Sequence, residues 1–147
     1  LSANDSTDSG LFRPLQVPAL CDRVAPLAAL LVDFHAEATA EKQAFGWYVD
    51  GRVSAVLGTH THVQTADEQI FPGGTAFLCD GGFTVPHESV IGREIEPIIA
   101  RFMTNVPQRF EVAKGRVLLQ GAVIDIDETT GRARGIQRLS EPLPVEG

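Results

Sequence analysis

The sequence predicts a mixed α/β fold, an α/β or α+β layered sandwich. Short apolar runs typical of strands alternate with a helical pattern early in the chain, and strand patterns separated by turns follow one another near its end. With 147 residues, of which 44% are hydrophobic, the chain is long enough for one domain with a buried core. We divide it into an irregular or flexible segment over 1–27, a folded region over 28–141 and a tail over 142–147.

The first strand and the first helix follow a proline-rich approach, in which we expect one turn of helix around Ala19–Val24. Ala28–Phe34 is an apolar run interrupted only by Asp33, which is typical of a central strand covered on both faces. Thr39 begins a helical pattern that Asp50-Gly51 ends. The apolar stripe of this helix, whose aromatic members we expect in the core, is Ala40, Ala44, Trp47 and Tyr48.

Turn residues divide the next part of the chain into short strands. Val53–Leu57 is a second apolar strand, and it ends at Gly58. Glu68–Phe71 and Thr75–Cys79 flank Pro72-Gly73-Gly74, a composition that predicts a hairpin or tight turn.

The last third of the chain predicts one helix and an antiparallel meander. Arg93–Met103 has apolar residues at helical spacing, so we expect a surface-packed helix with Pro97 in its first turn. Arg109–Val112, Arg116–Asp127 and Ala133–Leu139 are separated by turn residues, which is the pattern of paired strands.

Composition and charge exclude several classes of partner. The net charge is −7 and the twelve Lys and Arg are scattered, so we expect no nucleic-acid polymer as a partner. Cys21 and Cys79 are too few for a disulfide framework, and the absence of a membrane span or signal-peptide pattern favours a cytoplasmic protein. The polar opening and the lack of an initiator methionine at Leu1 indicate a chain cut out of something longer.

The sharpest chemical feature is the segment Gly58-Thr59-His60-Thr61-His62, which follows the second strand. In an extended segment, His60 and His62 would point to the same side with Cα atoms about 6.5–7 Å apart. Two imidazoles so placed can converge on one metal or hold neighbouring metals of a pair. The motif alone has many innocent matches, because a histidine beyond a strand end is often an ordinary loop residue.

His35 follows the first strand in the same way that His60 follows the second. If the two strands lie side by side, both histidine groups reach one sheet edge and give three nitrogen ligands. On its own, His35 would be read as a partly buried or capping histidine. The nearby carboxylates either accept an imidazole N–H from outside the metal site or are plain loop charges; they are Asp33, Glu37 and Asp80. We expect His87 in an exposed loop and Cys79 as an inert buried thiol.

Several blocks of the sequence resemble the YmdB-like bacterial metallophosphoesterases. The resemblance runs from about Leu31 to Leu139, and the blocks occur in the family's order. They are Val32-Asp33-Phe34-His35-Ala36-Glu37-Ala38-Thr39 with Glu41-Lys42, Gly51-Arg52-Val53-Ser54-Ala55-Val56, Gly58-Thr59-His60-Thr61-His62-Val63-Gln64-Thr65-Ala66-Asp67, and Ser89-Val90-Ile91-Gly92.

The resemblance implies a calcineurin-like αββα sandwich, of which this chain is the C-terminal part. It implies a two-metal site, with iron or manganese as the usual occupants and zinc as a further option, and hydrolysis of a small phosphodiester such as 2′,3′-cyclic AMP. His35 and His60 would bind one metal and His62 the other. Paired cations of this kind clamp a phosphate and generate the nucleophile for in-line attack.

The sequence departs from the family by lacking the ligands of its first half. An early Asp, a bridging acidic ligand and an Asn-His pair that includes the general acid have no counterpart in Leu1–Phe34, and Asn4-Asp5 is a poor substitute. The loops Asp80-Gly81-Gly82-Phe83 and Pro86-His87-Glu88 also differ from the sequence that is usual in the family.

Three neutral imidazoles bring no negative charge to offset the repulsion between two cations. We therefore expect full activity to need a missing N-terminal half, supplied by a longer parent chain, a partner chain or a swapped homo-oligomer. Two alternatives stay open. The chain could be a non-catalytic metal-binding or regulatory module of the same lineage, or a mononuclear zinc hydrolase that uses the three histidines and water.

Overall fold

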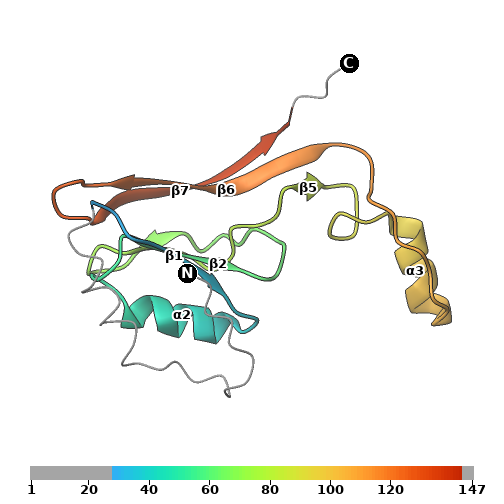
Figure 1. Cartoon of the computed structure of the whole chain (residues 1–147), viewed down its shortest axis with the longest axis horizontal. Coiled ribbons are helices and arrows are strands. Elements are labelled where there is room, and N and C mark those ends of the chain that lie inside the picture. Colours follow the sequence, from blue (N-terminus) through green and yellow to red (C-terminus); the bar gives the residue numbers. More distant parts are fainter. Residues whose placement is uncertain (1–27, 144–147) are drawn as a thin grey trace. The chain divides into compact units, whose positions relative to one another are not determined.

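The computed structural model describes residues 28–143, which fall into two compact units. The first unit contains the described chain up to Gly82 together with Ala122–Arg138, and the second contains Phe83–Gly121 and the chain from Leu139 onward. Figure 1 shows the elements of each unit. They are β1 (Leu31–His35), α2 (Thr39–Tyr48), β2 (Ala55–Thr59), β3 (Gln69–Ile70), β4 (Ala76–Leu78), β5 (Val85–Pro86), α3 (Ile95–Thr104), β6 (Val117–Ile126) and β7 (Ala133–Pro142).

The sheet of the first unit has the strand order β1-β2-β4-β3. β1, β2 and β4 are parallel, and the short β3 pairs with β4 in the antiparallel sense, as the hairpin prediction required. The register aligns His35, the last residue of β1, with Thr59, the last residue of β2. Because parallel strands end at the same edge, the residues that follow β1, β2 and β4 emerge together.

Two layers cover this sheet within the first unit (Figure 1). On one face, Phe45 and Val49 of α2 pack with Val56 and Phe77 in the main hydrophobic cluster. On the other face, Ala55, Ala76 and Ala133 form a second cluster with apolar residues of the β6–β7 hairpin, Ile124 and Ile136. The predicted mixed α/β layering is therefore confirmed for this unit, with small alanines allowing the hairpin to approach the sheet closely.

The buried face of α2 differs from the prediction. Trp47 and Tyr48 are 55% and 39% exposed, although Trp47 stacks on Phe71 with ring centroids 4.1 Å apart. The predicted alanines, Ala40 and Ala44, are exposed as well. The face that enters the core consists of Lys42, Phe45, Gly46 and Val49, which also recur at helical spacing. The prediction was wrong because the stripe was chosen from apolar residues alone, whereas the buried face includes a lysine and a glycine.

β1 also differs from the prediction of a central strand. Within the described residues it pairs with β2 and forms an edge of the sheet, and its residues alternate between exposed and half-buried. Leu31 is 58% exposed. Hydrophobicity along the strand predicted two covered faces, whereas this strand has one covered face and an open side.

The second unit is built around β5, which pairs antiparallel with the start of β6. α3 begins at Ile95, so Pro97 lies in its first turn as predicted. Its apolar face is less buried than predicted, because Ile98 is buried whereas Ile99 and Phe102 are 54% and 84% exposed. The expected strand over Arg109–Val112 is wrong, since this segment makes just an isolated bridge between Val112 and Arg93. β5 takes the place of that strand beside β6.

Two further expectations concern helices. The turn of helix expected around Ala19–Val24 lies outside the described residues. Between residues 28 and 143, no helix is both long and apolar enough to cross a membrane.

Candidate metal-binding site

His35 and His60 meet at the carboxyl edge of the sheet. The Nε2 atom of His35 and the Nδ1 atom of His60 are 3.1 Å apart, and the two rings cross at 74° with centroids 5.0 Å apart. Both histidines are exposed to solvent. The predicted convergence of the two strand ends is thus realised for this pair, because β1 and β2 are parallel neighbours that end in register.

A chain of hydrogen bonds fixes the proton position of His35. The Thr59 hydroxyl donates to Oδ1 of Asp33 over 3.1 Å, so its oxygen is left to accept from Nδ1–H of His35, also at 3.1 Å. With the proton on Nδ1, Nε2 of His35 carries a lone pair, and in this structure it accepts a hydrogen bond from Nδ1–H of His60 over 3.1 Å. Asp33 therefore influences the orientation of the imidazole through Thr59 rather than by direct contact.

The facing nitrogens fit a shared cation. Two nitrogens that are each about 2.1 Å from one metal and about a right angle apart lie about 3 Å from each other, which matches the spacing of this pair. Imidazole is also a ligand type that suits zinc and iron. The geometry and the donor chemistry of His35 and His60 are therefore compatible with a metal.

The third predicted ligand is not part of this cluster. Within residues 28–143, no three side chains of His, Cys, Asp or Glu are grouped closely enough to hold a metal. The expected extended path through the motif is wrong, because φ is +139° at His60 and +62° at His62. Residues with positive φ do not alternate as a β-strand does, so His62 need not share the side of His60. Glu37 lies exposed between β1 and α2.

Asp80 follows β4 and is fully buried beneath the histidine segment. Its carboxylate accepts hydrogen bonds from the backbone amides of Thr61 over 2.7 Å and Gly82 over 3.0 Å. Burial by itself would raise the pKa of Asp80, but these hydrogen bonds and the nearby Lys42 ammonium together hold that pKa below its ordinary value. Asp80 is thus a charged anchor for the backbone rather than a partner of an imidazole.

The other predicted residues behave as simple structural groups. His87 is exposed just beyond β5, as expected. Cys79 is a free, buried cysteine, and burial raises the pKa of its thiol, which agrees with an inert side chain. Sequence reasoning missed Thr59 and Lys42. Thr59 lies directly before His60 and could have been found from the strand register, whereas nothing in the local pattern marked Lys42 as buried.

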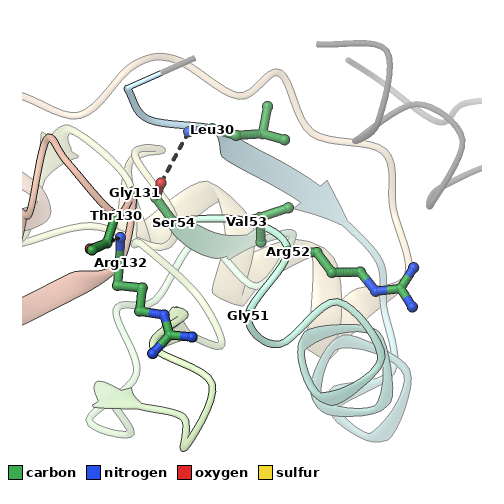
Figure 2. A pocket seen from close by; sticks show the side chains of 8 residues that line it. All are labelled: Leu30, Gly51, Arg52, Val53, Ser54, Thr130, Gly131 and Arg132. Atoms are coloured by element: carbon green, nitrogen blue, oxygen red, sulfur yellow. Dashed lines mark hydrogen bonds between the residues drawn. The ribbon is translucent and has the colours of Figure 1, made fainter. Parts of the chain in front are cut away.

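A pocket of about 110 Å³ lies at the opposite end of the sheet, before β1 and β2 begin (Figure 2). The Ser54 hydroxyl at its wall accepts a hydrogen bond from the Leu30 amide over 3.1 Å. Figure 2 shows the side chains of Arg52 and Arg132 extending in different directions, so they do not converge on one anion. The histidine pair remains the stronger candidate site.

The sequence also matches known proteins over most of its length. The family model described as YmdB-like protein matches residues 15–139. The 2′,3′-cyclic-nucleotide 2′-phosphodiesterase of Bacillus subtilis (strain 168) is 57% identical over 110 residues, which make up 75% of this chain and 42% of that protein. The chain therefore spans less than half the length of this curated relative.

Two solved structures share the fold. A hypothetical protein from Thermus thermophilus has a TM-score of 0.78 and 39% identity, with 89% of this chain and 51% of that chain covered. A novel phosphatase from Mycoplasma pneumoniae has a TM-score of 0.78 and 34% identity, with 88% of this chain and 46% of that chain covered. About half of each longer chain thus lies outside the similarity.

Proposed function

Because the chain belongs to the YmdB-like family, we propose that it supplies the histidine part of a metal-dependent phosphodiesterase that hydrolyses cyclic nucleotides such as 2′,3′-cyclic AMP. The family resemblance predicted from the sequence is confirmed, and the Bacillus subtilis relative bears the name of that activity. The observation that carries the proposal is the pair of ring nitrogens of His35 and His60, which face each other over 3.1 Å at the sheet edge.

In this proposal His35 and His60 hold one divalent cation and His62 holds a second. When bound, paired cations would neutralise the charge of the phosphate and activate the attacking water. The chain's own contribution is to position the imidazole nitrogens, and the Asp33–Thr59 hydrogen-bond chain keeps the proton of His35 on Nδ1, so that Nε2 can act as the ligand. With a net charge of −7, the protein itself would repel an anionic substrate, so bound cations are needed to attract it.

The remaining ligands are proposed to come from outside this sequence. Two cations held close together need a carboxylate between them, and imidazoles alone bring no negative charge. The relatives are about twice as long or more, which leaves a large unmatched part for acidic ligands and a general acid. A longer parent chain, a partner chain or an oligomer could each supply that part. Iron or manganese is the proposed occupant.

Metal binding tests the histidine assignment. We expect the 147-residue chain to bind Mn²⁺ weakly, and we expect His35→Ala and His60→Ala to abolish that binding, as measured by electron paramagnetic resonance of the free ion. His87→Ala is the matched control, because His87 is also exposed but lies beyond β5 in the second unit. Mn²⁺ binding that persists in both His35→Ala and His60→Ala would show that these histidines are not the metal ligands.

A turnover assay tests whether this chain carries only the histidine half of the active site, which we call the half-site. We expect little turnover of 2′,3′-cyclic AMP by the chain with Mn²⁺, and recovery of turnover when the unmatched part of the Bacillus subtilis relative is added. Strong turnover by the chain alone would refute the half-site. Retained Mn²⁺ binding without recovery by the added part would favour the alternative, a non-catalytic metal-binding module.

A further inference from the structure

The backbone of the histidine segment, Gly58–His62, is strained at two residues. His60 and His62 both have positive φ, at +139° and +62°, a region that L-amino acids other than glycine rarely adopt. Two such residues on either side of Thr61 cost free energy, so surrounding contacts must hold the segment in place. The question is which residues supply those contacts.

Asp80 supplies the central contact. The Thr61 amide, which lies between the two positive-φ residues, donates to Oδ2 of Asp80 over 2.7 Å. The backbone of Asp80 is tied in turn, since its carbonyl accepts from the Thr65 amide over 3.1 Å and its amide donates to the Thr65 hydroxyl over 2.9 Å. The loop after β4 therefore holds the loop after β2 both within the histidine segment and beyond it.

Lys42 forms a buried ion pair with the Asp80 carboxylate. Its ammonium lies 3.6 Å from Oδ2 of Asp80, with both side chains at most 1% exposed, and it also donates to the Thr59 carbonyl over 3.5 Å. A buried charge is strongly unfavourable without a partner, so each member of this pair requires the other. Gly58 makes room for the arrangement, because a Cβ there would lie 2.8 Å from Cδ of Lys42 and 1.8 Å from the Cys79 carbonyl oxygen.

We propose that Asp80 and Lys42 are positioning residues for the metal site: the buried ion pair holds the Thr61 amide and thereby keeps the His60 ring facing His35. The inference rests on the proposed function, since it assigns these two residues a role in presenting the metal ligands. Neither residue touches the metal in this scheme. Both act through the backbone between His60 and His62.

The same unit contains a comparable anchor that does not reach the histidines. At the opposite end of the sheet, the Asp50 carboxylate accepts hydrogen bonds from the amides of Gly73 over 2.7 Å and Thr75 over 3.2 Å. Asp50→Asn therefore weakens a carboxylate anchor of the same kind far from His35 and His60. It is the matched control for a purely structural effect.

The experiment uses the full 147-residue chain and two readouts. The first is the Kd for Mn²⁺ alone, and the second is the nuclear Overhauser contact between the His35 and His60 rings in metal-free protein. We expect Asp80→Asn to raise the Kd about tenfold or more, which is typical for a residue that supports metal ligands from outside, and to remove the ring contact. Asp50→Asn should lower the melting temperature but leave both readouts unchanged.

A second variant covers the case in which Asp80→Asn does not fold. Lys42→Met/Asp80→Leu replaces the buried pair by apolar side chains of similar size, a change that proteins often tolerate without loss of stability. It still removes the acceptor for the Thr61 amide. We therefore expect a folded protein that has lost the ring contact and most of its Mn²⁺ affinity.

The ring contact decides the positioning role independently of metal. Retention of both readouts in Asp80→Asn and in the double variant would overturn the proposal, as would equal losses in Asp50→Asn. If the wild-type chain binds no Mn²⁺ but loses the ring contact in the Asp80 variants alone, the proposed function fails and the positioning role stands. If the wild-type chain binds Mn²⁺ and those variants keep both the ring contact and the wild-type affinity, the proposed function stands and the positioning role fails.

Discussion

The two ends of the first unit's sheet are tied down by the same device. At the amino end, the Asp50 carboxylate accepts hydrogen bonds from the amides of Gly73 and Thr75 and so joins the end of α2 to the turn before β4. At the carboxyl end, the Asp80 carboxylate accepts from the Thr61 amide and joins the loops that follow β2 and β4. In both places one short acidic side chain replaces the backbone pairing that the strands no longer provide.

The two ends differ in which residues adopt positive φ. At the amino end they include the glycines Gly51 at +78° and Gly74 at +94°, whereas at the carboxyl end two histidines, His60 and His62, adopt positive φ in addition to Gly82 at +86°. Glycine adopts such conformations without strain, so it is the expected choice where only the path of the chain matters. Histidines in the same conformation are strained, which is the pattern expected if the imidazoles have the proposed role in metal binding. The carboxylate at the carboxyl end, Asp80, is also paired with the buried ammonium of Lys42.

The largest expected effect is that of Gly58→Ala at the carboxyl end. A Cβ at this position would lie 1.8 Å from the Cys79 carbonyl oxygen, which belongs to the neighbouring backbone and cannot move aside. We expect a loss of about 3 kcal/mol in the free energy of unfolding, at the upper range for overpacking. Urea denaturation measures this loss.

Gly73→Ala gives the corresponding measurement at the amino end. Its Cβ would meet the carboxyl group of Asp50 at 2.7 Å, and this group sits on a side chain that can shift. We therefore expect a smaller loss than for Gly58→Ala. Equal losses would show that the two ends are packed with the same tolerance and would remove this part of the contrast.

Thr59→Val is expected to have the next largest effect, and it acts on metal affinity. The substitution preserves shape but removes the hydroxyl that joins Asp33 to Nδ1 of His35, so the tautomer of His35 is no longer fixed. We expect an approximately tenfold weaker Kd for Mn²⁺, about 1.4 kcal/mol, with little change in stability. Long-range proton–nitrogen correlation spectra of the His35 ring report the tautomer directly. An unchanged tautomer in Thr59→Val would contradict the proposed hydrogen-bond chain.

The sequence was enough to predict that the histidines lie at one edge of the sheet. It was not enough to predict the buried residues that hold them there. Apolar runs before His35 and His60 were enough to place both histidines beyond strand ends, and the parallel register then brought their rings together. Lys42 was missed because a lysine at a core position cannot be recognised without its partner Asp80, which lies 38 positions later. That pairing depends on tertiary structure, as does the positive φ at His60, which a propensity scale assigns to glycine.

The exposure of α3 and β1 could not be predicted either. Periodicity shows which face of a helix is apolar, but it does not show what covers that face. In α3, the apolar positions Ile99 and Phe102 recur as expected and remain largely exposed within the described structure. The apolar composition of β1 likewise predicted a central strand, whereas the strand order makes it an edge.

A smaller effect, of opposite sign, is expected for His60→Gly. Glycine tolerates the φ of +139°, so the substitution relieves strain and should stabilise the fold by up to about 1 kcal/mol while removing a proposed metal ligand. Thermal denaturation and Mn²⁺ titration of the same variant measure the two consequences. His87→Gly is the control, because His87 is not among the residues with positive φ and should gain no stability. Destabilisation by His60→Gly would mean that the segment is not strained.

The smallest expected effect is at the turn that connects β6 and β7, where Asp127 is a third carboxylate anchor. Its Oδ1 accepts hydrogen bonds from the amides of Thr130 over 3.0 Å and Thr129 over 2.9 Å, and these hold the pKa of Asp127 below its ordinary value. A lowered pKa means that the charged form favours the folded state. Its stabilisation is therefore present above the unfolded pKa of about 3.9 and is lost as the pH falls through the lower folded pKa.

Asp127→Asn keeps the shape of this turn and removes its charge. We expect a slightly lower urea midpoint than wild type at pH 7 and no difference once the pH is below the folded pKa, where the wild-type carboxyl is also neutral. The direct chain contacts of Asp127 are to turn amides and to Arg134, whose nitrogen lies 3.7 Å from Oδ2, so Mn²⁺ affinity should not change. Of the three carboxylates, the proposal assigns an effect on the histidines to Asp80, through its hydrogen bond to the Thr61 amide. A changed Mn²⁺ affinity in Asp127→Asn would contradict that assignment.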